Sequence, residues 1–171
     1  APSDIVISQV YGGGGNNGSV YRNDFIELFN RGASDVNVGG MSVQYASSAG
    51  PTGTNTWGTT ALPAKTLKPG QFLLVQLAAG AGTTQALLPT PDAVGTTAVS
   101  GTNAKFLLSS GTIPLAGFRP TESVLDFLGW GSTNGAEGTS AGATTNPTGV
   151  ARIDACVDTD NNAADFVVRT P

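Results

Sequence analysis

The amino-acid sequence predicts an all-β protein built as an antiparallel sandwich, and three observations support this fold class. The 171 residues include 24 Gly and 10 Pro, with many Thr, Ser, Asn and Val residues, a composition that suits turns and strands better than helices. Short apolar runs of strand length recur along the chain, and turn residues separate them. A chain of this length is expected to form one domain, residues 1–171, with a substantial core.

We expect about nine strands. They are assigned to residues 4–11, 23–30, 35–38, 41–45, 72–77, 103–109, 124–130, 150–154 and 165–169, with 62–67 as a further short strand. The connections follow from their turn residues. Four glycines at 12–15 predict a hairpin connection; the alternative, a phosphate-binding loop, lacks a Gly-Lys-Ser/Thr ending and a following helix. Residues 68–71 predict a type II turn and 78–86 a short helix, whereas 46–60, 87–101 and the small-residue segment 131–148 are expected to be loops.

The run NDFIELFN at residues 23–30 carries a carboxylate inside an apolar alternation. Successive side chains of a strand point to opposite faces, so Glu27 shares one face with Phe25 and Phe29. Burying a lone carboxylate is costly, and Glu27 therefore needs either water or a partner. The candidate partners are Arg22, Arg31, Arg119 and Arg152. Arg152 is favoured because its strand is expected to return near the start of the domain.

Charge and residue usage exclude several function classes. Eight basic and twelve acidic residues give a formal net charge of −4, which disfavours strong direct nucleic-acid binding. The chain has no His, so Ser-His-Asp and Cys-His catalysis is excluded and a zinc site is not expected. Asp24 and Glu27 make an unpersuasive catalytic pair because few aromatic residues could line a cleft. We therefore expect no enzymatic activity.

Three further features bear on location and packing. Charged residues are only 12% of the chain and it begins with Ala1, which predicts a secreted or cell-surface protein after signal-peptide removal. No apolar run is long enough to span a membrane. Cys156 has no internal disulfide partner and is interpreted as a small buried hydrophobe, the alternative being an exposed thiol. Trp57 and Trp130 are assigned to packing rather than to sugar stacking.

The segment DTDNN at residues 158–162 is the strongest candidate for a metal site. Its alternating oxygen-bearing side chains can converge when the backbone turns, and Ca²⁺ takes about six to eight oxygen ligands. An EF-hand is excluded, since Ala163 and Arg169 occupy the positions that need Gly and Glu. An Asx-rich turn without metal is the alternative. The candidate ligands are Asp158, Asp160, Asn162 and Asp165, with Glu27 as a further ligand through a shared cation.

These segments together resemble the bacterial branch of the lamin tail domain family. The resemblance lies in IVISQVYGGGG at 5–15, NDFIELFN at 23–30, MSVQY at 41–45, KPGQFLLV at 68–75, and Arg152 with DTDNNAADF at 158–166. It implies an immunoglobulin-like antiparallel β-sandwich of about 8–10 strands with long Gly/Thr/Ser-rich loops. Glu27, Asp160, Asn162 and Asp165 match acidic or amide positions of the family motifs, and the family supplies no catalytic residues.

The resemblance also implies an accessory module, often placed ahead of a nuclease or phosphoesterase domain in secreted or surface-attached proteins. We therefore expect a non-catalytic module for binding or anchoring, stabilised by calcium, whose partner is a cell-surface or envelope protein or an attached catalytic domain. The alternative is a structural subunit of a surface layer or envelope complex, held by protein–protein contacts.

Overall fold

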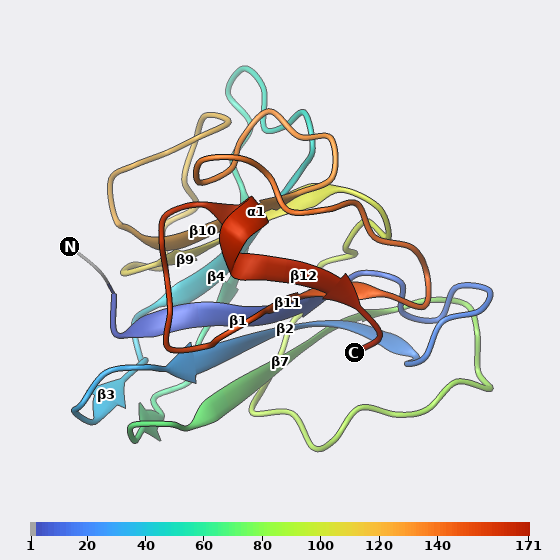
Figure 1. Ribbon diagram of the computed structural model, residues 1–171, viewed down its shortest axis with the longest axis horizontal. Helices are drawn as coiled ribbons and strands as arrows, with labels where there is room; N and C mark the ends of the chain where they lie inside the picture. The colour runs from blue at the N-terminus through green and yellow to red at the C-terminus, as the bar shows by residue number, and fades with distance from the viewer. Residues whose placement is uncertain (1–2) are drawn as a thin grey trace.

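The computed structural model describes residues 3–171, and within them it is nearly all β (Figure 1). The expectation of a processed N-terminus rests on Ala1 and lies outside the described residues. The larger sheet has six strands in the order β12-β11-β1-β2-β7-β8. These are β12 (Phe166–Arg169), β11 (Gly149–Arg152), β1 (Ile5–Tyr11), β2 (Asn23–Asn30), β7 (Phe72–Ala79) and β8 (Ala93–Val94). All neighbours are antiparallel except the parallel pair β7 and β8.

A second, four-stranded sheet has the order β10-β9-β4-β5 and is antiparallel throughout. Its strands are β10 (Val124–Trp130), β9 (Ala104–Ser109), β4 (Ser42–Ser47) and β5 (Gly58–Ala61). The short strands β3 (Val36–Asn37) and β6 (Thr66–Leu67) form a separate pair, and α1 (Asn162–Asp165) precedes β12. Figure 1 shows the two larger sheets as layers, with α1 beside β10 and β12. The expected all-β antiparallel sandwich is thereby confirmed.

The main core lies between these two sheets. Ile26 and Leu28 of β2, with Leu73 of β7, pack into one apolar cluster with Phe106 of β9 and Leu128 of β10. All five side chains are at most 1% exposed. This confirms the predicted orientation of residues 23–30, because Ile26 and Leu28 point inward and Glu27 points to the opposite face of the sheet. We call that face the outer face of the six-stranded sheet.

A smaller apolar cluster covers the other side of the four-stranded sheet, where Trp57 packs on Leu107 and Phe127. Lys105 is buried beside it and donates hydrogen bonds to the carbonyl oxygens of Gly50 and Phe118 and to the side-chain oxygen of Asn134. Trp57 and Trp130 are both 1% exposed, as expected for packing residues.

Several sequence predictions of local structure are wrong. The predicted helix at 78–86 is absent: β7 runs on to Ala79, and Gly80 lies against the backbone of Gly15, closer than a Cβ atom would permit. That close approach explains the glycines there. The predicted loop 46–60 overlaps the end of β4 and most of β5, and the strand predicted at 62–67 is reduced to β6.

Other turn and strand predictions are confirmed. The glycine loop joins the antiparallel neighbours β1 and β2, and Gly70 adopts a φ of 78° in the turn at 68–71, where Gln71 N–H donates to the Lys68 carbonyl. The strand that carries Arg152 returns to β1, where Ala151 pairs with Gln9. Cys156 is exposed, so its interpretation as a buried hydrophobe is wrong; it lies in the irregular segment between β11 and α1.

Candidate acidic site

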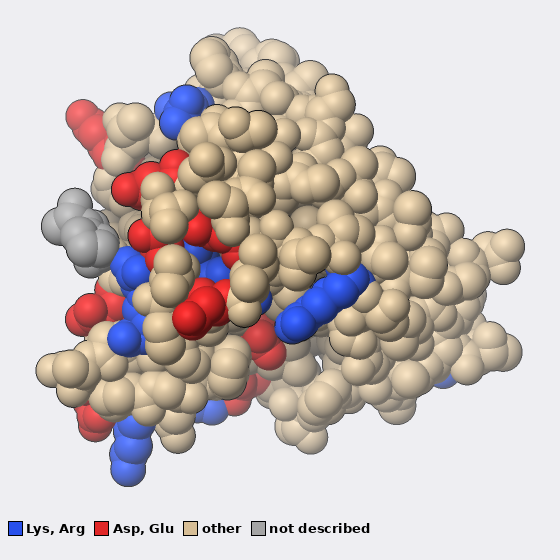
Figure 2. Space-filling model, viewed as in Figure 1, with Lys and Arg blue, Asp and Glu red and all other residues tan. Residues whose placement is uncertain are grey.

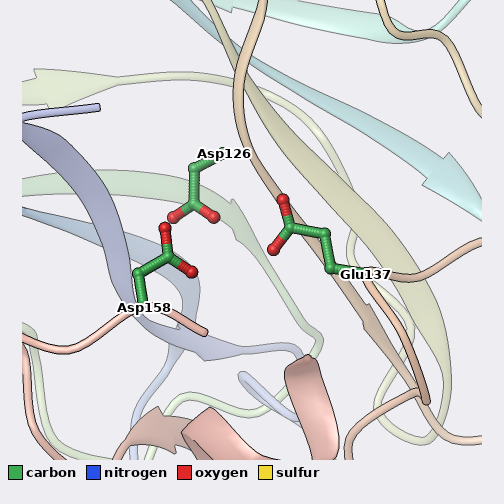
Figure 3. Close-up of side chains that lie close together, drawn as sticks. All are labelled: Asp126, Glu137 and Asp158. Carbon is green, nitrogen blue, oxygen red and sulfur yellow. The ribbon is translucent and has the colours of Figure 1, made fainter. Parts of the chain in front are cut away.

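Three carboxylates converge at one end of the sandwich. Asp126 comes from β10, Glu137 from the loop after β10, and Asp158 from the segment between β11 and α1. One oxygen from each lies within 4.8 Å of the others, and Figure 3 shows the three groups facing a common point. Figure 2 shows acidic and basic side chains mixed on this side of the molecule, whereas most of the same face carries no charge. We call Asp126, Glu137 and Asp158 the acidic cluster.

Arg152 is the cation that organises the acidic cluster. Its side chain extends from β11 toward the space between the sheets and is buried. Nη2 donates to Asp126 Oδ2 at 3.0 Å, and Nη1 lies 3.4 Å from Asp158 Oδ1 and 3.5 Å from Asp165 Oδ2. Nε donates to the Ile7 carbonyl and Nη1 to the Val157 carbonyl, both at 3.0 Å. One guanidinium thus ties the two sheets and the C-terminal segment together.

Phe166 and Arg31 complete the surroundings of Arg152 and the acidic cluster. Its guanidinium carbon stands 4.6 Å from the centre of the Phe166 ring, which is a cation–π distance. Arg31 provides a second cation, 3.5 Å from Asp158 Oδ2. Four carboxylates, counting Asp165, therefore face two guanidiniums, and the group is formally −2 when every member is ionised.

Asp126 has little capacity left for chemistry. Its Oδ2 accepts the Ile7 amide at 2.6 Å as well as Arg152, and its Oδ1 accepts the amide of Phe127 at 2.9 Å. Burial raises the pKa of Asp126 to about 6, although Arg152 and the two amides oppose the shift. Asp126 lies on the edge strand β10 but is only 2% exposed, so these hydrogen bonds and Arg152 take the place of water around its carboxylate.

Glu137 is the member of the acidic cluster that lacks a cation within ion-pair distance among residues 3–171. Burial raises the pKa of Glu137 to about 8, and the charges of Asp126 and Asp158 add to the effect. Asn162 holds the loop in place: its Oδ1 accepts the Glu137 amide at 3.1 Å and the Gly129 amide at 2.9 Å, and its Nδ2 donates to the Phe127 carbonyl at 2.9 Å.

The structure separates the ligands predicted from the sequence. Of the five predicted ligands, only Asp158 belongs to the acidic cluster. Asn162 is buried and hydrogen-bonds to the loop that carries Glu137 and to β10. Asp165 accepts hydrogen bonds from the Thr159 amide at 2.9 Å and the Thr159 hydroxyl at 2.7 Å. Asp160 is exposed at a φ of 54°. Most of the segment thus serves local turn bonding, the alternative considered for this sequence, and Asp158 faces inward.

Glu27 lies elsewhere, and the predicted pairing of Glu27 with Arg152 is wrong. Arg152 points into the sandwich, whereas Glu27 projects from the outer face, so the sheet itself separates them. Glu27 Oε1 accepts a hydrogen bond from the Ser8 hydroxyl at 2.7 Å. Ser8 stands at the bulge of β1, between Ile7, which pairs with Leu28, and Gln9, which pairs with Glu27.

Sequence reasoning missed Asp126 as the principal partner of Arg152, and it missed Glu137. One signal was available for Asp126, since a single carboxylate inside VLDFLGW must be satisfied if that strand is buried. Glu137 stands among small residues with no periodic pattern around it. Chemically, the acidic cluster offers hard oxygen ligands suited to a divalent cation, and Asp126, Glu137 and Asp158 are the residues that could hold it.

Comparisons with known proteins agree with the fold. The family model described as Lamin Tail Domain matches residues 1–132. A crystal structure of a DUF4876 family protein from Bacteroides thetaiotaomicron is similar over 97% of this chain and 71% of that chain, with a TM-score of 0.62 and 14% sequence identity. At that identity the likeness concerns the fold. Among curated proteins, none matches this chain.

Proposed function

Because the chain belongs to the lamin tail domain family, an immunoglobulin-like β domain, we propose that it is a non-catalytic module that binds or anchors a partner protein outside the cell. The partner is a cell-surface or envelope protein, or a nuclease or phosphoesterase domain attached to the same polypeptide. No helix within residues 3–171 has the length and apolar character needed to cross a membrane.

The observation that carries this proposal is the apolar character of the outer face. Three large apolar side chains on this face are highly exposed: Phe72 at 51%, Val94 at 66% and Val167 at 43%. Phe72 pairs with Phe29 and Val94 with Gln76, while Val167 pairs with Ala151. Phe72 and Val94 lie near the β7–β8 edge and Val167 on the opposite edge strand β12. Exposed apolar side chains that share one face favour a protein interaction site there.

The acidic cluster supports a structural role. A catalytic base must reach its substrate. The carboxylate of Asp126, however, is already bound by Arg152 and two backbone amides, and that of Asp158 forms ion pairs with Arg31 and Arg152. In the proposal these carboxylates stabilise the sandwich. Calcium adds to that stability by binding Asp126, Glu137 and Asp158, where the residual negative charge favours a cation.

A binding measurement tests the proposal directly. We expect the purified chain to be retained by an envelope fraction of its source organism, and the double variant Phe72→Ser/Val94→Ser to lose roughly ten-fold or more of that affinity. The matched control is Ile113→Ser/Phe118→Ser, which removes exposed apolar side chains, 78% and 55% exposed, from the loop between β9 and β10. Equal retention of the two double variants would contradict an outer-face site.

The second candidate, a structural subunit of a surface layer, is favoured by the low charge of 12%, since weakly charged surfaces associate readily. Sedimentation velocity distinguishes the two. A subunit forms ordered oligomers as concentration rises, whereas a solitary binding module sediments as a monomer over the same range.

A further inference from the structure

A pocket opens on the outer face around Glu27. Gln9 of β1, Glu27 of β2 and Leu74 of β7 stand side by side across three paired strands and form its floor. The walls are Tyr21, Phe25, Leu88, Pro89 and Pro171. Its volume is about 130 Å³, well above the roughly 10–15 Å³ that one water needs. The pocket can therefore take a small ligand or a single inserted side chain.

Glu27 brings a charge to this pocket that the chain itself leaves without an ion-pair partner. Its one hydrogen bond comes from the Ser8 hydroxyl, and among residues 3–171 no Lys or Arg nitrogen lies within 4.0 Å of it. Burial raises the pKa of Glu27 above its usual value, with the Ser8 hydrogen bond and the more distant Arg169 opposing the shift. A half-buried carboxylate with so few partners favours an added cation.

The aromatic wall favours the same kind of ligand. The rings of Tyr21 and Phe25 are 6.1 Å apart between centres and meet edge to face, at 79°. Both border the pocket that contains Glu27. Aromatic rings attract cations electrostatically, and the attraction grows when the cation is partly removed from water. A carboxylate and aromatic rings thus line one small volume.

We propose that this pocket binds a primary alkylammonium group, with the ammonium at Glu27 and the alkyl chain against Leu74, Leu88 and Pro89. The ammonium donates to the Glu27 carboxylate and to the Gln9 side-chain oxygen. A divalent metal does not suit the pocket, because calcium needs about six oxygen ligands and the lining offers one carboxylate. A neutral ligand leaves the charge of Glu27 uncompensated.

The alkylammonium group can come from a free amine or from a lysine side chain, since both present the same chemistry. The inference does not require the partner protein proposed above. A free amine binds here even if the outer face attracts no protein, and loss of envelope binding leaves amine binding unaffected.

NMR titration of the ¹⁵N-labelled chain tests the proposal, with n-butylammonium, neutral 1-butanol and Nα-acetyl-lysine methylamide as probes. We expect saturable shifts of the Gln9, Glu27 and Leu74 amides with n-butylammonium and at least roughly ten-fold weaker binding of 1-butanol. Tighter binding of the lysine derivative than of the free amine identifies a lysine side chain as the source, and the reverse order identifies a free amine; either order supports the ammonium site.

Two variants complete the test. Glu27→Gln retains an acceptor for the Ser8 hydroxyl and should fold, yet it should weaken n-butylammonium roughly ten-fold or more. Arg169→Met removes the nearby competing cation and should leave binding equal or tighter. Equal binding of n-butylammonium and 1-butanol, absence of saturable shifts, or unchanged amine affinity in Glu27→Gln would each overturn the proposal.

Discussion

Replacing Arg152 by Met tests whether one buried guanidinium holds the sandwich together. The substitution keeps an aliphatic side chain of similar length but removes the donors to the Ile7 and Val157 carbonyls and the ion pair to Asp126. It leaves the carboxylate of Asp126, 2% exposed, without its cation. Removing one partner of a buried ion pair costs about 3–5 kcal/mol.

That loss corresponds to a fall of roughly 6–20 °C in the unfolding midpoint for a chain of this size. Urea unfolding in the presence of a chelator, followed by the fluorescence of the buried Trp57 and Trp130, gives the free energy directly. The free energy of unfolding of Arg152→Lys should lie between those of wild type and Arg152→Met, since an ammonium group cannot reproduce the planar set of guanidinium donors. The control is Arg169→Met on β12, which removes an exposed arginine. A loss below about 1 kcal/mol for Arg152→Met would show that the buried guanidinium does not hold the sandwich together.

Two further predictions concern calcium and pH. Millimolar calcium should raise the thermal midpoint relative to chelator in wild type and have little effect in Asp158→Asn, because only the folded state assembles the acidic cluster; an unchanged wild-type midpoint would rule out the calcium site. Burial lowers the pKa of Lys105 from 10.5 to about 8. Between these two pH values the unfolded chain binds more protons than the folded chain, so the free energy of unfolding should rise with pH. Urea unfolding from about pH 8 to about pH 10.5 should show that rise in wild type; the same slope in Lys105→Met would exclude Lys105 as its cause.

The parts of the fold that sequence reasoning predicted correctly are those with a local signal. Residues 23–30 alternate apolar and polar side chains, and the structure places Ile26 and Leu28 in the core. The turn at 68–71 has Pro and Gly at the required positions. By contrast, β5 has the sequence GTTA and forms because β4 offers it an unpaired edge, which no pattern within residues 58–61 reveals.

The acidic site was only half predictable for a related reason. Sequence reasoning placed Arg152 on a strand that returns to the start of the domain, and β11 does pair with β1. Glu27 is nevertheless the wrong partner, because the adjacency of two strands does not tell which face a side chain occupies. The true partner, Asp126, comes from the opposite sheet, and the packing of two sheets brings together residues with no mutual spacing in the sequence.

An activity measurement tests most directly whether the chain is a non-catalytic module whose acidic cluster is structural. Supercoiled DNA and a chromogenic phosphodiester are incubated with the wild-type chain and with Asp158→Asn, with calcium or magnesium, from about pH 6 to about pH 9. We expect no hydrolysis above buffer for either protein, together with lower stability of Asp158→Asn because Arg31 and Arg152 lose a shared partner. Metal-dependent hydrolysis by wild type that disappears in a folded Asp158→Asn would contradict it.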